Sequence, residues 1–204
     1  MVDYSKAFGR PFTDWKNLLI GIVISAIPIV CLISYGYILK STVKNPTGNL
    51  PAWDDFGDLF TKGLLAAVIS FLYILPALII LMILGLPLII GIMRGNLTDI
   101  VGGAVGLGFG ILIALLVLSI AYYFIPAALL NYAAKGKFNA AFDFNAINKK
   151  VFTGKYALAW TIGVVYSVLL ISILNVIPYI GIIIGGFIGS VTMYSLIGQA
   201  IKTK

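Results

Sequence analysis

The sequence predicts an all-α fold, a polytopic bundle of transmembrane helices with amphipathic helices at the membrane surface. Apolar residues make up 61% of the 204 residues and charged residues 10%, whereas soluble domains are roughly 45–50% apolar and about 25% charged. The apolar blocks 63–93 and 100–130 exceed the roughly 20 residues that cross a bilayer as a helix. Neither block alternates polar and apolar residues, as strands of a membrane barrel do. We therefore expect one integral membrane domain over 1–204.

About five spans follow from the apolar pattern, at 17–39, 63–93, 100–130, 155–175 and 179–200. The only charged residue in these ranges is Lys155, at the edge of the fourth. In the second range, Gly85-Leu86-Pro87 predicts a break, because proline lacks the N–H of a helical hydrogen bond and clashes with the preceding turn. We expect a crossing helix followed by a short half-helix there. Pro178 and Gly181 predict a tight reversal between the last two spans.

The first range, 17–39, has two interpretations. Its 23 residues suffice for a full crossing, whereas Ile27-Pro28 at its centre predicts a re-entrant hairpin. Lysine and arginine concentrate in cytoplasmic loops. With a full crossing, 40–62, 131–155 and the C-terminus hold ten basic residues against four opposite; with a hairpin the balance is thirteen against one, Arg94. Both interpretations place 40–62, 131–155 and the C-terminus, with Lys149 and Lys204, on the cytoplasmic side of the cell membrane.

Amphipathic segments precede the spans that begin at 17, 63 and 155. Each carries aromatic residues at helical spacing and charged residues on another face, which is typical of helices that lie in the membrane interface. We predict that these rings contact membrane lipids at headgroup depth. The predicted anchors are Trp15, Trp53, Phe56, Phe60, Phe142, Phe144 and Trp160. The segments are either anchored connectors or a docking surface for a partner.

The chain also predicts an internal repeat. An aromatic polar segment, a span, a proline break and a glycine-rich span occur at 50–130 and again at 138–200, after an N-terminal region at 1–49. Small residues let helix backbones approach closely in membranes. They predict packing within one bundle, or contacts in a homo-oligomer or a membrane protein complex. The predicted packing glycines, four residues apart, are Gly102, Gly106 and Gly110, and Gly181, Gly185 and Gly189.

Two long stretches carry a resemblance to a known family. They are LPAWDDFGDLFTKGL, which begins at Leu50, and IPAALLNYAAKGKFNAAFDF, which begins at Ile125. With Ile27-Pro28-Ile29-Val30, they make the chain similar to a prokaryotic membrane protein family known only as a domain of unknown function, number four-zero-one-three. The resemblance covers nearly the whole chain and implies a polytopic membrane protein without an established activity. The family's interfacial segments are richer in arginine and glutamate, so a charge-dependent role is weaker here.

Few residues of the chain are suited to chemistry. It has no histidine, no glutamate and one cysteine. Asp54, Asp55 and Asp58 form a DDxxD pattern, whose spacing suits Mg²⁺ on a diphosphate. Acidic residues at the start of a helix also complement its dipole, and no second acidic cluster accompanies these three. We therefore expect no catalytic residue, no cofactor and no metal, with this triplet as the remote alternative.

The remaining polar residues predict packing more than activity. Thr161, Ser172, Asn175 and Gln199 lie in or beside spans and do not ionise, so we expect hydrogen bonds between helices from them. Asn96-Leu97-Thr98 is a glycosylation sequon in the loop expected outside the cell. The net charge of +7 comes from basic residues dispersed at the ends of spans, so nucleic acid is not an expected partner.

Three functions are compatible with the sequence. We favour a non-catalytic membrane scaffold or accessory subunit of a membrane complex, which offers aromatic helices and glycine faces to lipid or to a partner. A transporter or channel for a small neutral solute is the alternative, because repeats and proline-broken helices are typical of transporters. A lipid or isoprenoid enzyme that uses Asp54, Asp55 and Asp58 is the remote one.

Overall fold

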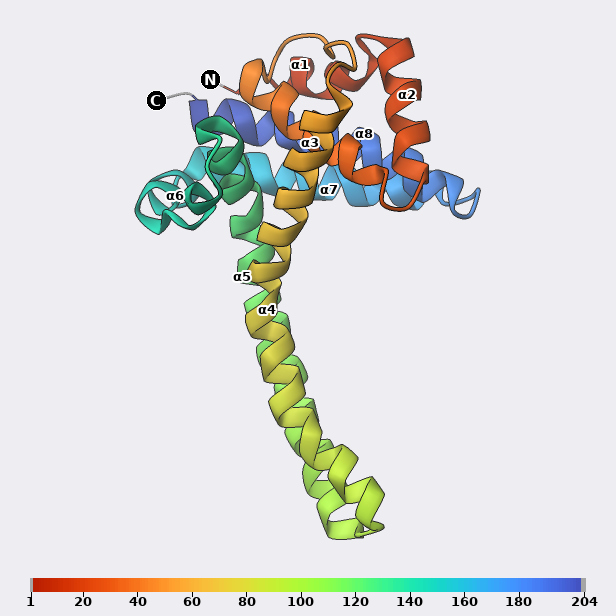
Figure 1. Cartoon of the computed structure of the whole chain (residues 1–204), viewed down its shortest axis with the longest axis vertical. Coiled ribbons are helices and arrows are strands. Elements are labelled where there is room, and N and C mark those ends of the chain that lie inside the picture. The colour runs from red at the N-terminus through yellow and green to blue at the C-terminus, as the bar shows by residue number, and fades with distance from the viewer. Residues whose placement is uncertain (1, 203–204) are drawn as a thin grey trace. The chain divides into compact units, whose positions relative to one another are not determined.

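The computed structural model describes residues 2–202, and the described chain is all-α, as predicted. Met1, Thr203 and Lys204 lie outside the described residues, and with them the expected cytoplasmic position of Lys204. The α-helices are α1 (Tyr4–Gly9), α2 (Trp15–Ala26), α3 (Cys31–Lys44), α4 (Phe56–Arg94), α5 (Leu97–Lys135), α6 (Phe144–Val151), α7 (Gly154–Leu174) and α8 (Ile180–Lys202). Two short 3₁₀ helices are η1 (Arg10–Phe12) and η2 (Phe138–Phe142). Figure 1 shows the course of the chain.

Four of these helices, α4, α5, α7 and α8, are long and apolar enough to cross a membrane. The fifth expected span, 17–39, is not one helix. It is divided between α2 and α3, which are joined by Ile27–Val30. The interpretation of this range as a continuous crossing is therefore wrong, and the chain folds into the alternative helical hairpin. Proline at position 28 causes the division, because it restricts the residue before it to extended backbone, and Ile27 is extended.

The expected break at Gly85-Leu86-Pro87 is also wrong, because α4 runs without interruption through Pro76 and Pro87. Proline is tolerated inside membrane helices where a neighbouring helix stabilises the freed backbone groups. The neighbour is α5, whose Gly103 lies so close that a Cβ built there would stand 2.8 Å from the carbonyl carbon of Pro87. This second helix gives α4 the support that a proline-containing helix lacks when it stands alone.

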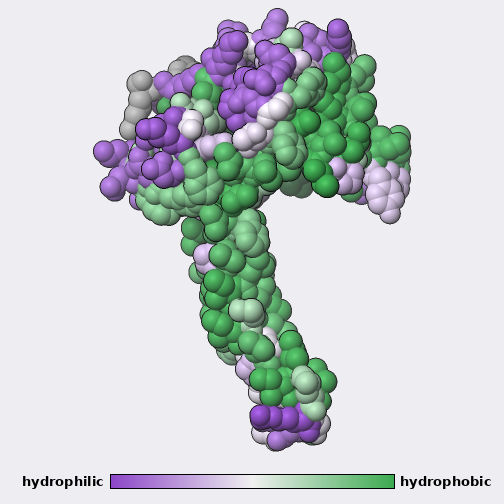
Figure 2. Space-filling model, in the orientation of Figure 1, coloured by the Kyte–Doolittle hydropathy of each residue, from purple (hydrophilic) through white to green (hydrophobic). Residues whose placement is uncertain are grey.

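The chain divides into two compact units, unit 1 (residues 2–68 and 126–202) and unit 2 (residues 69–125). Unit 2 is the antiparallel pair of the later part of α4 and the earlier part of α5. The face of this unit that Figure 2 shows is almost entirely hydrophobic apart from the connection between these helices. Large side chains such as Phe71, Met82 and Leu112 are exposed on it, which suits lipid as the surrounding solvent.

In unit 1 the core forms around α8, which packs against α1, α2, α3 and α7. In the most apolar stretch of α8, 67% of the residues are buried, against 11% in that of α7. Leu196 and Ile197 on α8 are fully buried, as are Leu18 on α2 and Leu39 on α3. Because four other helices pack on it and most of its residues are buried, α8 organises unit 1.

The glycine series of α8 packs against α7 of the same chain. A Cβ built on Gly185 would lie 3.0 Å from Ile171 Cγ1 and 3.1 Å from Ile171 Cα, and one on Gly189 would lie 2.7 Å from Ser167 Oγ. Gly181 likewise approaches the backbone of Leu174. These close approaches make the series an intramolecular helix contact.

The series at Gly102, Gly106 and Gly110 is used only in part. In unit 2, α4 covers Gly110, where a Cβ would lie 2.9 Å from Leu84 Cβ, whereas nothing lies within 4 Å of a Cβ on Gly102. Gly106 lies at the edge of this contact, where a Cβ would stand 3.5 Å from Leu84 O. The period of the contact is therefore seven residues, from Gly103 to Gly110, because one face of a helix recurs after two turns.

We expect Gly185→Leu to lower the thermal stability of the protein clearly, and Gly186→Leu to leave it close to that of the parent. The leucine at position 185 would collide with the backbone of α7, and overpacking of this kind costs about 1–3 kcal/mol. Gly186, the next residue, has nothing within 4 Å of its Cβ position and is the matched control. Thermal unfolding in mild detergent measures both; equal melting temperatures would contradict the α7–α8 contact.

Candidate functional site

Three segments of unit 1 share one local pattern. Each has an aspartate before a helix, then an aromatic residue, and a basic residue seven positions after the aspartate: Asp3, Tyr4 and Arg10; Asp55, Phe56 and Lys62; Asp143, Phe144 and Lys150. Each aspartate Oδ1 accepts the backbone N–H three residues on, at 3.0, 3.2 and 3.1 Å. The side chain four residues on is fully buried in every case, as Ala7, Leu59 and Ile147. Sequence reasoning paired the second and third segments and missed the first, although its aspartate-to-basic spacing was the signal.

The first and third segments agree further along the chain. Thr13 Oγ1 donates to Arg10 O at 2.8 Å, and Thr153 Oγ1 donates to Lys150 O at 2.8 Å. An exposed phenylalanine precedes each threonine, and an apolar helix, α2 or α7, begins directly afterwards. These two segments therefore lead into helical hairpins, α2–α3 and α7–α8, through the same local structure.

The basic residue of each segment has a different partner. Lys62 Nζ lies 2.7 Å from Asp58 Oδ2, whereas Lys150 Nζ donates to the amide oxygen of Asn131 at 2.9 Å, and burial lowers the pKa of Lys150. Arg10 is 1% exposed and donates from Nε to Gly48 O at 3.1 Å. Burial lowers the pKa of Arg10 to about 10, because water solvates the charged form better than the interior does. Among residues 2–202 no carboxylate forms an ion pair with this guanidinium, and its bond to Gly48 O joins η1 to the connection after α3.

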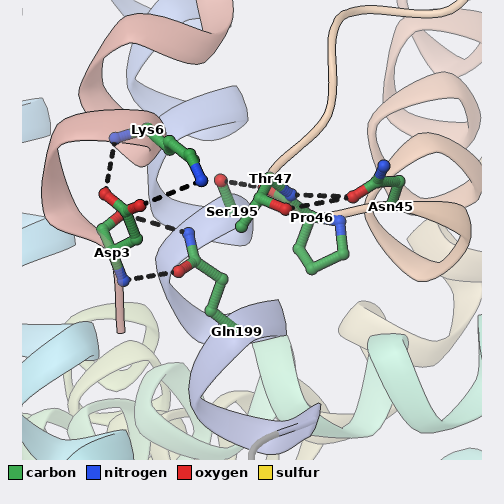
Figure 3. Close-up of polar contacts among 7 residues, drawn as sticks. All are labelled: Asp3, Lys6, Asn45, Pro46, Thr47, Ser195 and Gln199. Carbon is green, nitrogen blue, oxygen red and sulfur yellow. Dashed lines mark hydrogen bonds and ion pairs between the residues drawn. The ribbon is translucent and has the colours of Figure 1, made fainter. Parts of the chain in front are cut away.

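The N-terminus and the connection after α3 are fastened to α8 by polar side chains (Figure 3). Gln199 accepts the backbone N–H of Asp3 at 2.7 Å and donates back to Asp3 O at 3.3 Å. Ser195, one turn earlier, donates to Pro46 O. Because Ser195 and Gln199 are buried, each bond also satisfies a polar group that would otherwise be costly. These contacts hold the N-terminal segment and the connection after α3 against the buried polar side chains of α8.

Of the four polar residues expected between helices, Gln199 is buried and bonded as described. The other three are exposed on α7 or directly after it, and are Thr161, Ser172 and Asn175. That part of the expectation is wrong, because α7 buries only a narrow face against α8 and leaves these positions outside it.

The acidic triplet surrounds the start of α4. Asp55 caps the helix, while Asp58 Oδ2 lies 3.0 Å from Lys40 Nζ and 2.7 Å from Lys62 Nζ. Asp54 is 3.8 Å from Lys40 Nζ. Within residues 2–202, no group of three or more His, Cys, Asp or Glu side chains is arranged to hold a metal ion. Each carboxylate of the triplet thus has a lysine or a backbone N–H as its partner.

The predicted aromatic anchors fall into two groups. Trp15 is 64% exposed beside Phe12, with ring centroids 5.9 Å apart, and Phe56 and Phe144 are exposed as well. Three further anchors are half-buried, namely Phe60, Phe142 and Trp160. Trp53 is also half-buried and points inward: its ring stacks on Tyr37 at 3.8 Å, and its Nε1 donates to Asn17 O at 3.1 Å.

Comparison with known proteins identifies a family whose function is unknown. The family described as "Protein of unknown function (DUF4013)" matches residues 19–179, which confirms the resemblance predicted from the sequence. No curated protein and no solved structure matches the chain.

Proposed function

Since the chain belongs to this family of unknown function, DUF4013, we propose its role from its own structure: a non-catalytic membrane scaffold or accessory subunit of a membrane complex. The observation that carries the proposal is how the two units use their side chains. Unit 2 presents apolar side chains on almost all of its surface, while the acidic residues described above in unit 1 cap helices or pair with lysines. Such a surface is suited to contact with lipid or with another helix, and these carboxylates stabilise the fold. Both features are what we expect of a non-catalytic membrane protein.

The orientation that we propose places 40–62, 131–155 and the C-terminus in the cytoplasm. Of the fourteen basic residues, twelve belong to the ranges of unit 1, Arg94 ends α4 in unit 2, and Lys204 lies outside the described residues. Basic residues are retained on the cytoplasmic side, and this distribution supports the cell membrane as the location. A cysteine at position 149 in a Cys31→Ser background should escape an impermeant maleimide added to intact cells. Labelling there would reverse the orientation.

The scaffold role is tested by purification from native membranes in mild detergent. We expect the chain to retain phospholipid or one membrane protein at a fixed ratio. Gly102→Leu is the variant to compare, because nothing in the chain lies within 4 Å of a Cβ there. It should leave the thermal stability unchanged and weaken association if this exposed glycine contacts a partner. Gly103→Leu, which collides with α4, separates loss of fold from loss of partner.

The alternative of a transporter for a small neutral solute loses one of its supports, because α4 is not broken at Pro87. Proteoliposomes that contain the protein decide between the two functions. We expect glycerol and urea to enter these proteoliposomes no faster than they enter protein-free vesicles. Flux that exceeds the protein-free rate, and that falls after heat inactivation, would replace the scaffold proposal by facilitated passage.

A further inference from the structure

The turns of the two hairpins in unit 1 have the same structure. Ile27-Pro28-Ile29 joins α2 to α3, and Ile177-Pro178-Tyr179 joins α7 to α8. In both, the residue after proline has a positive φ, 69° at Ile29 and 65° at Tyr179. The hydrogen bonds correspond one to one: the N–H two residues after proline donates to the proline carbonyl at 2.8 Å, and the next N–H donates to the isoleucine carbonyl at 2.9 Å.

This turn suits an apolar solvent. A β-branched residue at positive φ is a rare conformation that costs about 1–2 kcal/mol, and glycine or asparagine would adopt it more easily in water. Yet Ile29 holds it while 72% exposed, and Tyr179 while 81% exposed. Proline has no N–H, Ile27 donates back to Ile24 O of α2, and Val30 and Cys31 donate to carbonyls of the turn. Among residues 27–31, only the N–H of Ile29 lacks a backbone acceptor. With one donor left unpaired, the turn comes close to what hydrocarbon requires of a chain reversal, a backbone that satisfies its own polar groups.

Two serine hydroxyls of the α2–α3 hairpin also find their hydrogen-bond partners inside the hairpin. Ser25 and Ser34 hydroxyls lie 2.7 Å apart across the two helices, and Ser25 Oγ donates to Gly21 O at 2.7 Å. Between Lys16 and Lys40 the sequence has no charged residue. The hairpin thus carries lysines at its two outer ends and no charge at its turn. This is the charge distribution of a segment that enters a bilayer from the side of its lysines.

Helix length determines how far the hairpin reaches. The twelve residues of α2 extend about 18 Å, against a hydrocarbon core of about 30 Å. In contrast, α7 has 21 residues, or about 32 Å, enough to cross. The same turn therefore ends one hairpin that spans the hydrocarbon and one that stops inside it.

We propose that α2–α3 is a half-membrane hairpin whose tip, Ile27–Val30, lies among acyl chains near the centre of the bilayer, inserted from the face that carries Lys16 and Lys40. Both hairpin turns lie on the same side of unit 1 in Figure 1, and the surface there is mostly hydrophobic in Figure 2. Phe187 of α8 packs on Gly21 of α2, so the two hairpins are in contact. This placement goes beyond the scaffold role and does not depend on it.

The test measures depth at three positions in vesicles of phosphatidylcholine and phosphatidylglycerol. Single cysteines replace Ile29, Val176 and Thr47 in a Cys31→Ser background and carry a nitroxide label. We expect collisions with oxygen to exceed those with a water-soluble nickel chelate several-fold at position 29, and the reverse at position 47, an exposed polar connection. Position 176, at the end of the crossing hairpin, should be intermediate. A nickel-accessible label at 29 overturns the proposal, and so does a label shielded from both reagents, which would indicate protein contact there.

A second measurement needs no label. Asparagine adopts positive φ more readily than isoleucine, so Ile29→Asn should raise the melting temperature if the tip is in water. In acyl chains the amide would have no water to bind, and the same substitution should lower the melting temperature in vesicles. Unmodified Cys31, two residues on, supplies the parent's own probe, and rapid reaction with an impermeant maleimide in sealed vesicles would contradict the placement.

Discussion

Replacing Gly63 by alanine is expected to destabilise unit 1 strongly. At this residue α4 crosses α3 with backbone against backbone: a Cβ on Gly63 would stand 2.7 Å from the carbonyl carbon of Leu32 and 3.1 Å from the nitrogen of Gly36. The reciprocal holds, because a Cβ on Gly36 would stand 3.0 Å from the nitrogen of Gly63. Main-chain atoms cannot rotate away as a side chain can. The helices must therefore separate, and the dispersion contacts along their interface weaken.

The control for this prediction lies on the same helix. Gly57, in the first turn of α4, has only Asp55 Oδ1 at 4.0 Å from its Cβ position. Alanine there should be neutral or stabilise by up to about 1 kcal/mol, the difference in helix propensity. That gain is common to both sites, so the difference between Gly63→Ala and Gly57→Ala, about 1–3 kcal/mol, reports the crossing alone. If the two variants unfold at the same temperature in detergent, α3 and α4 do not cross here.

The sequence predicts which residues are helical better than it predicts which helices meet. Composition and block length suffice for the all-α membrane class, because backbone in lipid has few alternatives to the helix. The four-residue glycine spacing on α8 coincides with the face that lies against α7. The spacing does not predict which helix packs on that face, since α7, a helix of a second subunit and the other glycine series could each pack there. The α3–α4 crossing was not expected, because it uses one glycine from each helix and leaves no periodic pattern in either.

Proline was the least reliable signal. Pro28 separates two helices, as one of the two interpretations of 17–39 predicted, whereas Pro87 is accommodated inside α4. The two differ in surroundings that the local sequence does not contain: α5 supports the backbone at Pro87 through Gly103, and α2 and α3 reverse direction at Pro28. The candidate site shows the same limit. Its aspartate-to-basic spacing is readable in the sequence, but the partner of each basic residue comes from a distant segment, as Thr42 and Gly48 do for Arg10.

Trp53→Ala is expected to destabilise the protein by about 3 kcal/mol, the lower end of the cost of truncating a buried tryptophan, because Trp53 is half-buried. Its ring lies parallel to that of Tyr37, with an interplanar angle of 6°, and the ring centroid of Phe187 is 6.5 Å away. The sequence predicts a lipid anchor at this position because Trp53, Phe56 and Phe60 match a helical period. That period does not apply, because Asp55 caps α4 and Trp53 precedes the helix.

Two further variants separate the interior role from the anchor role. Trp53→Phe keeps an aromatic ring on Tyr37 and loses the hydrogen bond to Asn17 O, so it should cost only about 1 kcal/mol. Trp15→Ala removes an exposed ring that touches Phe12, so its stability in detergent should stay near that of the parent, while its effect in lipid is larger. The expected order of destabilisation in detergent is therefore Trp53→Ala, Trp53→Phe, Trp15→Ala. If Trp53→Ala is no more destabilising in detergent than Trp15→Ala, the indole of Trp53 serves the membrane interface and not the core of unit 1.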